Sequence, residues 1–74
     1  MSDEERARRV LETTLGVTVP PGSDLRREDE PKWDSLKHVV LIFAIEDEFE
    51  IQLDQEQMER LDSLGAILEV VRAA

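Results

Sequence analysis

A continuous apolar run, Val39–Ile45, stands in the middle of this chain and restricts its fold more than any other segment. On its own the run is ambiguous, because it is rich in β-branched residues and could be a buried strand. Phe49–Leu53 behind it alternates between apolar and polar residues, as the second strand of a hairpin would. The connection between the two, Glu46–Glu48, contains no glycine, asparagine or proline to form a hairpin turn. The hairpin is therefore the weaker of two interpretations.

A helix explains the same segment better, because apolar residues recur at steps of three and four from Leu36 to Phe43. Asp34 or Ser35 can serve as the N-cap. We predict a helix over Ser35–Phe49, about 22 Å long. Since the run is apolar on more than one face, we expect this helix to be central or to expose apolar side chains to a partner.

The amino-terminal segment has the pattern of an amphipathic helix. Ser2 and Glu5 have the spacing of a capping box, and apolar residues at helical spacing follow. Gly16 is suited to end the helix, because glycine adopts a positive φ at little cost. We predict a helix over about Asp3–Leu15.

Residues 17–33 form a long connection, and the stretch Pro20–Gly22 ends any regular element there. Loops of this length are uncommon in compact domains. We expect Leu25, which stands alone among charged residues, to pack onto the core. Trp33, the only tryptophan, is expected to anchor the end of the loop in the core rather than to contact a ligand.

Two further helices are predicted in the last third of the chain. Asp54 can cap a short helix over about Gln55–Leu61, with Met58 facing inward. Asp62 or Ser63 can cap the last helix, whose apolar stripe has helical spacing. That stripe consists of Leu64, Ile67, Leu68 and Val71. The pattern predicts an all-α fold, a small antiparallel helical bundle with three main helices, one short helix and a long loop between the first and second helices.

Composition limits both domain organisation and function. The 74 residues are assigned to a single domain, 1–74, with a small core. The 9 basic and 18 acidic residues give a net charge of −9, which repels nucleic acid and anionic lipid and favours partners with basic patches. The chain has no cysteine, no apolar stretch of about 20 residues, and no signal-peptide pattern. We expect a cytoplasmic monomer that does not insert into membranes.

Catalytic and metal-binding interpretations are both weak. Asp34, Ser35 and His38 are the residue types of a hydrolase triad, but neighbours on one helical turn do not build a shielded pocket with an oxyanion hole. The G-x-S-x-G elbow is also absent. A calcium site lacks the glycine-containing loop of an EF-hand. Its candidate ligands would be Asp54, Glu56, Glu59 and Asp62. We expect no catalytic activity and no metal site.

A phosphate group suits the same serine better. Attached to Ser35, it would lie at a helix N-terminus, where free backbone N–H groups and the helix dipole favour negative charge. Lys37 and His38 could add donors beside it. The alternative is that Ser35 only caps its helix.

The wider context of the serine resembles the acyl carrier protein family. The resemblance rests on Asp34-Ser35-Leu36, the apolar helix behind it, the ending Glu46–Leu53, and Asp62–Gly65 leading into the last helix. It covers about residues 33–72. The resemblance implies that Ser35 carries a 4′-phosphopantetheine arm, installed from coenzyme A by a phosphopantetheinyl transferase with magnesium, and flanked by the motif residues Asp34 and Leu36.

The resemblance also implies a carrier without catalytic activity of its own. It would hold acyl or aminoacyl intermediates as thioesters and present them to loading and processing enzymes of fatty acid, polyketide or specialised biosynthesis. Partner enzymes with basic patches would bind the Ser35–Phe49 helix, at Leu36, Lys37, Val40, Phe43, Glu46 and Asp47. An unmodified module that acts as an interaction scaffold through the same helix is the alternative.

Several positions depart from the common pattern of the family. Lys37 and His38 stand where many members have an acidic residue, and Val40 stands where glutamate is frequent. Glu50 replaces the usual glycine, so the helix must end without it. A tryptophan before the aspartate, as at Trp33, is unusual among family members of fatty acid synthesis. In this position the chain looks more like discrete carriers of specialised pathways. These departures leave the expected role as a carrier unchanged, but they do not indicate which enzymes are its partners.

Overall fold

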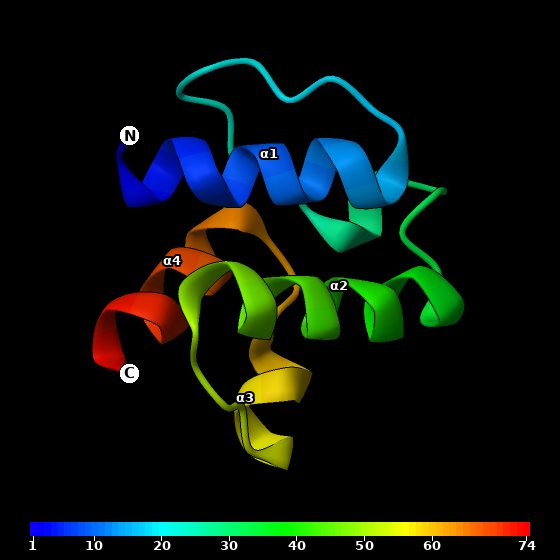
Figure 1. Ribbon diagram of the computed structural model, residues 1–74. Helices are drawn as coiled ribbons and strands as arrows, with labels where there is room; N and C mark the ends of the chain where they lie inside the picture. Colours follow the sequence, from blue (N-terminus) through cyan, green and yellow to red (C-terminus); the bar gives the residue numbers. More distant parts are fainter.

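The computed structural model describes all 74 residues and contains only helices and connections (Figure 1). The elements are α1 (Asp3–Leu15), the 3-10 helix η1 (Arg27–Asp29), α2 (Ser35–Phe49), α3 (Gln55–Arg60) and α4 (Leu64–Ala73). The predicted all-α class and the helix over Ser35–Phe49 are confirmed, and residues 39–53 do not form a hairpin.

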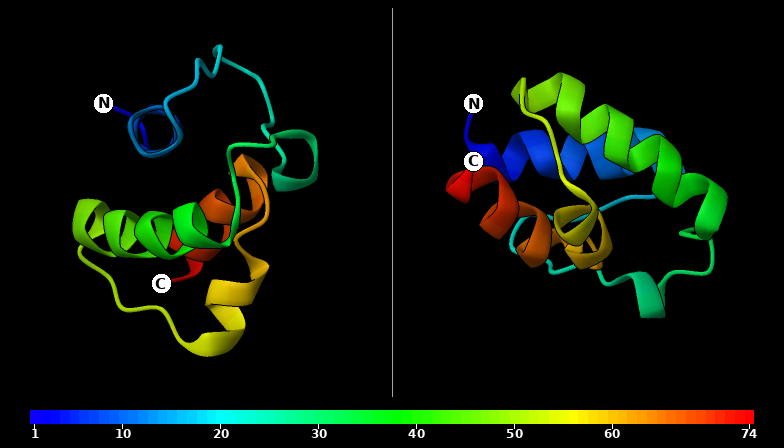
Figure 2. Two further views of the ribbon diagram at one scale, coloured as in Figure 1. Left: turned by 90° about the vertical axis from the view of Figure 1, so that its right-hand side faces the viewer. Right: turned by 90° about the horizontal axis from the view of Figure 1, so that it is seen from below.

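Figure 1 shows α1 and α2 one above the other and running in opposite directions. α4 packs against α1 and contacts α3, while α3 projects from the far side of α2 (Figure 2). The two termini lie at the same end of the molecule. The principal extents are 28 × 25 × 16 Å, so no residue is far from the surface.

Local signals decide where α1 begins and ends. The Ser2 hydroxyl accepts a hydrogen bond from the Glu5 amide at 3.1 Å, and the Glu5 carboxylate accepts one from the Ser2 amide at 3.5 Å, which completes the predicted capping box. Gly16 ends the helix with φ 70°, in the left-handed region that glycine adopts without a Cβ penalty.

The core is entirely apolar and is built mainly from α1, α2 and α4, while α3 adds only the partly buried Met58. Leu11 of α1, Leu41 and Ile45 of α2, and Ile67 of α4 are all fully buried. Trp33 is only 3% exposed, so its predicted role as a loop anchor is confirmed. Leu25 is partly buried against the same core, as expected.

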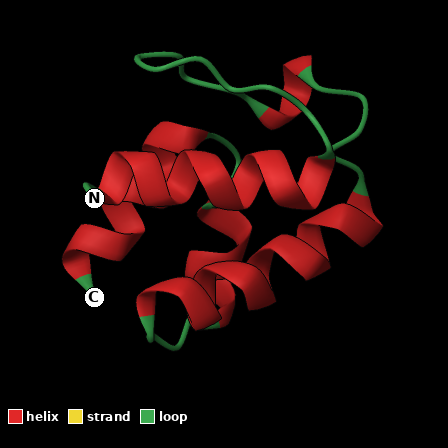
Figure 3. Ribbon diagram, turned by 45° about the horizontal axis from the view of Figure 1, so that its top comes forward, coloured by secondary structure: helices red, strands yellow, loops and turns green.

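The long connection passes over α1 and is tied to the rest of the molecule by hydrogen bonds (Figure 3). Near its start, the Val19 amide donates to the Glu12 carboxylate at 2.9 Å. Near its end, the Arg27 amide donates to the Asp62 carbonyl at 2.8 Å, beside an isolated bridge between Arg26 and Ser63. The connection is therefore held at both ends, which explains how a segment without long elements keeps its place.

Gly65 in α4 has a packing role that offsets its low helix propensity. Its amide donates to the Asp24 carboxylate at 2.9 Å, and a Cβ at this position would lie 3.3 Å from the same oxygen. An alanine would crowd Asp24, so the close approach of the long connection to α4 accounts for this glycine.

The helix predicted from the apolar stripe of α4 is confirmed, and burial along it adds one residue that the stripe did not include. Leu64 and Ile67 are buried as expected, but Val70 is the third buried residue, whereas Leu68 and Val71 are only partly buried. The apolar side of α4 is wider than the surface that it buries, and the most buried line of side chains runs through Val70. The spacing of apolar residues within one helix does not show which of them the fold buries most.

Candidate functional site

Ser35 is the first residue of α2 and its side chain is exposed. Asp34 precedes it in extended conformation, and the Asp34 carboxylate accepts a hydrogen bond from the Lys37 amide at 2.9 Å. Asp34 is therefore the N-cap, and the alternative that Ser35 only caps its helix is wrong. The Ser35 hydroxyl is free of intramolecular hydrogen bonds and open to solvent.

The first turn of α2 keeps two free donors beside this hydroxyl. The Lys37 amide is bound by the Asp34 side chain, and the His38 amide by the Asp34 carbonyl at 2.9 Å. The amides of Ser35 and Leu36 have no partner within the protein, as is usual at a helix N-terminus. They point out of a helix of 15 residues, whose dipole favours a negative group at this end.

A second Asp-Ser-Leu tripeptide, Asp62-Ser63-Leu64, precedes α4 and serves as an internal comparison. The Ser63 hydroxyl accepts a hydrogen bond from the Ala66 amide at 3.0 Å and caps the helix itself. Leu64 is 2% exposed, whereas Leu36 of the first tripeptide is 72% exposed. The two tripeptides thus differ in accessibility, and only the first presents a free serine.

His38 does not point toward Ser35. The Trp33 indole Nε1–H donates to His38 Nδ1 at 3.1 Å, and the opposite ring nitrogen, Nε2, lies 3.0 Å from the Met58 carbonyl oxygen. Since the indole can only donate and the carbonyl can only accept, these contacts fit an imidazole that accepts at Nδ1 and donates from Nε2. The expectation that His38 donates to a group on Ser35 is wrong, and this geometry offers Ser35 no imidazole base.

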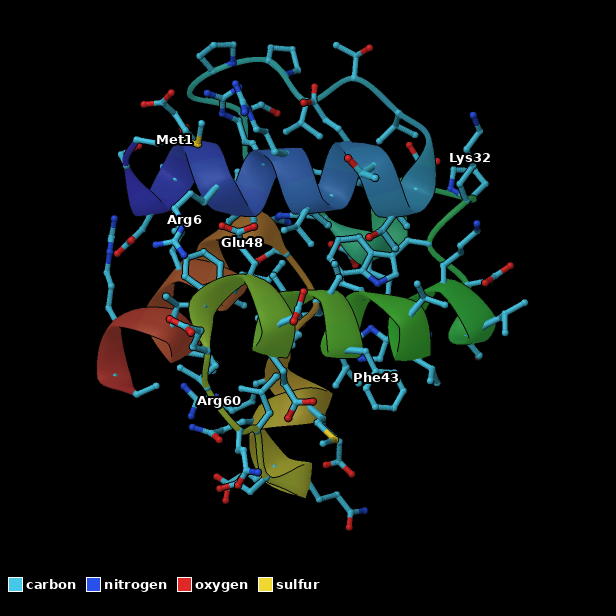
Figure 4. All side chains as sticks on the ribbon, in the orientation of Figure 1. Met1, Arg6, Lys32, Phe43, Glu48 and Arg60 are labelled. Atoms are coloured by element: carbon cyan, nitrogen blue, oxygen red, sulfur yellow. The ribbon has the colours of Figure 1, made fainter.

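An exposed apolar stripe follows Ser35 along α2. It consists of Leu36, Val39, Val40 and Phe43, which are 72%, 50%, 47% and 66% exposed. The opposite side of the helix is buried, so α2 both contributes to the core and exposes apolar side chains, the two alternatives that the sequence left open. Figure 4 shows the Phe43 ring on the side of α2 that faces away from α1. Val39 was absent from the predicted partner positions, although its spacing from Leu36 marks the same face.

Four carboxylates stand at the end of α2, and two of them are bound within the protein. Arg6 of α1 donates to the Glu48 carboxylate at 2.8 Å and also to the Glu48 carbonyl (Figure 4). The Glu46 carboxylate accepts a hydrogen bond from the Leu53 amide at 2.8 Å. Asp47 and Glu50 are exposed and take part in no ion pair.

The end of α2 is formed without glycine. Glu50 adopts the left-handed conformation, with φ 54° and ψ 48°, and its amide donates to the Glu46 carbonyl. Arg6 also places its guanidinium 4.5 Å from the centre of the Phe49 ring. The terminal turn is therefore held by contacts from α1, which compensate for a strained cap residue.

The remaining predicted positions have simpler surroundings. The Lys37 side chain is half-buried and forms no ion pair. Asp54 caps α3 by accepting from the Gln57 amide at 2.8 Å. No cluster of three or more histidine and carboxylate side chains converges as ligands of an ion would. None of the four helices combines the length and the hydropathy that crossing a bilayer requires.

No model of a known protein family matches this chain. The site is therefore defined by its own geometry: a free serine at a helix N-terminus, an exposed apolar stripe behind it, and a free carboxylate, Asp47, beyond the stripe.

Proposed function

We propose that this protein is a carrier that holds acyl or aminoacyl intermediates as thioesters on a 4′-phosphopantetheine arm attached to Ser35. The observation that carries the proposal is the contrast between the two Asp-Ser-Leu tripeptides. Ser63 is used as a helix cap, while Ser35 is released from capping by Asp34 and stands exposed. An attachment point must be reached by a modifying enzyme, and Ser35 meets that requirement.

The chemistry of attachment agrees with the surroundings of Ser35. The serine oxygen would form a phosphodiester with the phosphopantetheine phosphate of coenzyme A, releasing adenosine 3′,5′-bisphosphate, while the hydroxyl proton passes to a base of the transferase. The product carries one negative charge close to the free amides of Ser35 and Leu36. A helix N-terminus stabilises an anion in that place. The arm ends in a thiol, which supplies the thioester linkage to the cargo.

The surface around the arm supports recognition by partner enzymes. The exposed apolar stripe of α2 begins at Leu36, one residue beyond the attachment point, and offers an apolar surface for contact with a partner. The net charge of −9 steers the protein toward partners with basic patches and raises the rate of encounter. We propose that loading and processing enzymes of fatty acid, polyketide or specialised biosynthesis bind this face of α2.

The test is the intact mass of the protein after incubation with a broad-specificity phosphopantetheinyl transferase, magnesium and coenzyme A. A gain of one phosphopantetheine is expected for the native chain and for Ser63→Ala. Ser35→Ala should remain unmodified. Ser63→Ala is the matched control, because it removes the serine of the other Asp-Ser-Leu tripeptide. Modification of the Ser35→Ala variant would move the attachment point elsewhere.

The second candidate function is that of an unmodified interaction scaffold. The exposed apolar stripe on α2 favours a scaffold as much as it favours a carrier. The same experiment separates the two. An unchanged mass, under conditions that modify a control carrier protein, would reject the carrier and leave the scaffold.

A further inference from the structure

The acidic end of α2 divides into residues with different tasks. Glu46 and Glu48 are bound within the protein, by the Leu53 amide and by Arg6. Asp47 stands between them in sequence, but it forms no ion pair and no side-chain hydrogen bond. Their adjacency in sequence would suggest one shared acidic patch, and the contacts contradict that view.

Glu46 holds the connection from α2 to α3 from two sides. Its carboxylate accepts the Leu53 amide at 2.8 Å, and its carbonyl accepts the amides of Glu50 and Ile51, the latter at 3.1 Å. Leu53 is 6% exposed, so its amide has little access to water. Loss of the carboxylate would leave a nearly buried donor without a partner, which is costly.

Asp47 faces outward beside the apolar stripe. It follows Phe43 by four residues, so the two side chains are neighbours on the surface of α2. Both line a shallow groove together with Glu46, whose carboxylate is held by the Leu53 amide. The connection to α3 closes the other side of the groove through Ile51, Gln52 and Leu53. A cation entering this groove would meet the free Asp47 carboxylate next to the ring of Phe43, which is 66% exposed.

We infer that Asp47 is the carboxylate that binds a partner, and that Glu46 is a positioning residue that shapes the groove by fixing Leu53. The partner surface that fits presents an ammonium or guanidinium group beside an apolar side chain, matching Asp47 and Phe43. The assignment of Asp47 rests on the proposed function, whereas the part played by Glu46 can be measured in the isolated protein.

Charge reversal at both positions cannot separate these tasks, because either change would slow a partner enzyme. Glu46→Gln separates them, since glutamine keeps a carbonyl oxygen that accepts the Leu53 amide and loses only the charge. Glu46→Ala removes charge and acceptor together. Asp47→Lys reverses a charge that the fold does not use. Asp29→Lys is the matched control, because it makes the same change in net charge at an exposed residue of η1.

The experiment measures three quantities for each variant. These are the rate of modification by a broad-specificity phosphopantetheinyl transferase with coenzyme A at low and high salt, the thermal midpoint, and the hydrogen exchange of the Leu53 amide. Glu46→Gln should resemble the native chain in all three. Glu46→Ala should lower the midpoint by several degrees and accelerate exchange at Leu53. Asp47→Lys should keep the midpoint and lose roughly tenfold in rate at low salt, with the loss shrinking as salt is added.

Two outcomes would overturn the assignment. If Glu46→Gln slows the transferase as much as Asp47→Lys at an unchanged midpoint, Glu46 binds the partner. If Asp47→Lys changes the rate of modification no more than Asp29→Lys does, Asp47 does not bind the partner. A native chain that is never modified would reject the proposed function and the role of Asp47 with it. Even then, exchange at Leu53 in Glu46→Ala and Glu46→Gln still decides whether Glu46 positions the connection.

Discussion

Trp33 and His38 form a stacked, hydrogen-bonded pair at the start of α2, with 3.1 Å between Nε1 and Nδ1 and 6.3 Å between ring centres. The pair continues to α3, because His38 Nε2 lies 3.0 Å from the Met58 carbonyl. One imidazole thus joins the end of the long connection, the first turn of α2 and the last turn of α3. The turn that carries Ser35 is thereby held in place from inside the molecule.

Replacing His38 by alanine should destabilise the fold by about 1–3 kcal/mol, because it leaves the indole N–H of Trp33 without an acceptor and removes one of the two donors to the Met58 carbonyl. Trp33 is 3% exposed, so water does not readily replace the lost acceptor. Urea unfolding, followed by the fluorescence of the single tryptophan, measures the change. His38→Gln, which can satisfy one of the two partners, should fall between. An alanine variant as stable as the native chain would contradict the structural role of the pair.

Replacing Arg6 by alanine should cost about 1–2 kcal/mol, because one side chain supplies an ion pair, a bond to the helix-terminal carbonyl of Glu48 and a contact with the Phe49 ring. Arg9→Ala is the control: Arg9 is exposed on the same helix and forms no ion pair, so we expect a change within about 0.5 kcal/mol. Thermal unfolding compares the two variants. Equal losses would show that the contacts of Arg6 are not what stabilises the end of α2.

Replacing Glu50 by glycine should stabilise the protein. Glu50 adopts the left-handed conformation with φ 54°, which costs about 1–2 kcal/mol in a residue that has a Cβ. The greater freedom of glycine in the unfolded chain offsets part of the gain, so we expect a net increase of roughly 0.5–1 kcal/mol. Chemical denaturation gives the value. A loss of stability would mean that the Glu50 side chain makes a favourable contribution of its own.

Acid should weaken the hold of the long connection on α1 through Glu4. The hydrogen bond from Arg8, at 2.9 Å, lowers the pKa of the Glu4 carboxyl below its ordinary value of 4.5, and the Gly22 amide acts in the same direction. Because the folded-state pKa is the lower one, this contribution is complete above about pH 4.5 and is lost as the pH falls through the folded value.

A comparison of the native chain with Glu4→Gln checks this sign. The difference in stability between them should be largest near neutral pH and should diminish as the pH falls below 4.5. Since Glu4 lies at the surface, added salt should diminish it too. A difference that grows toward low pH would show that Glu4 acts by another route.

The sequence by itself determined the helices and their ends. The capping box at Ser2, the cap at Asp34 and the glycine at position 16 act on backbone groups a few residues away, so the bounds of α1 and α2 followed from local pattern. It also drew attention to Ser35 and to the apolar residues that form most of the stripe.

Only the tertiary structure decided which of these groups are free. Arg6 binds Glu48 across 42 positions, and the imidazole of His38 reaches Met58 across 20, so neither contact is visible in local spacing. The same limit hid the burial of Val70, the binding of Glu46 to Leu53, and the difference between two identical tripeptides. A side chain is available for recognition only when folding has not brought it a partner, and that depends on residues distant in the chain.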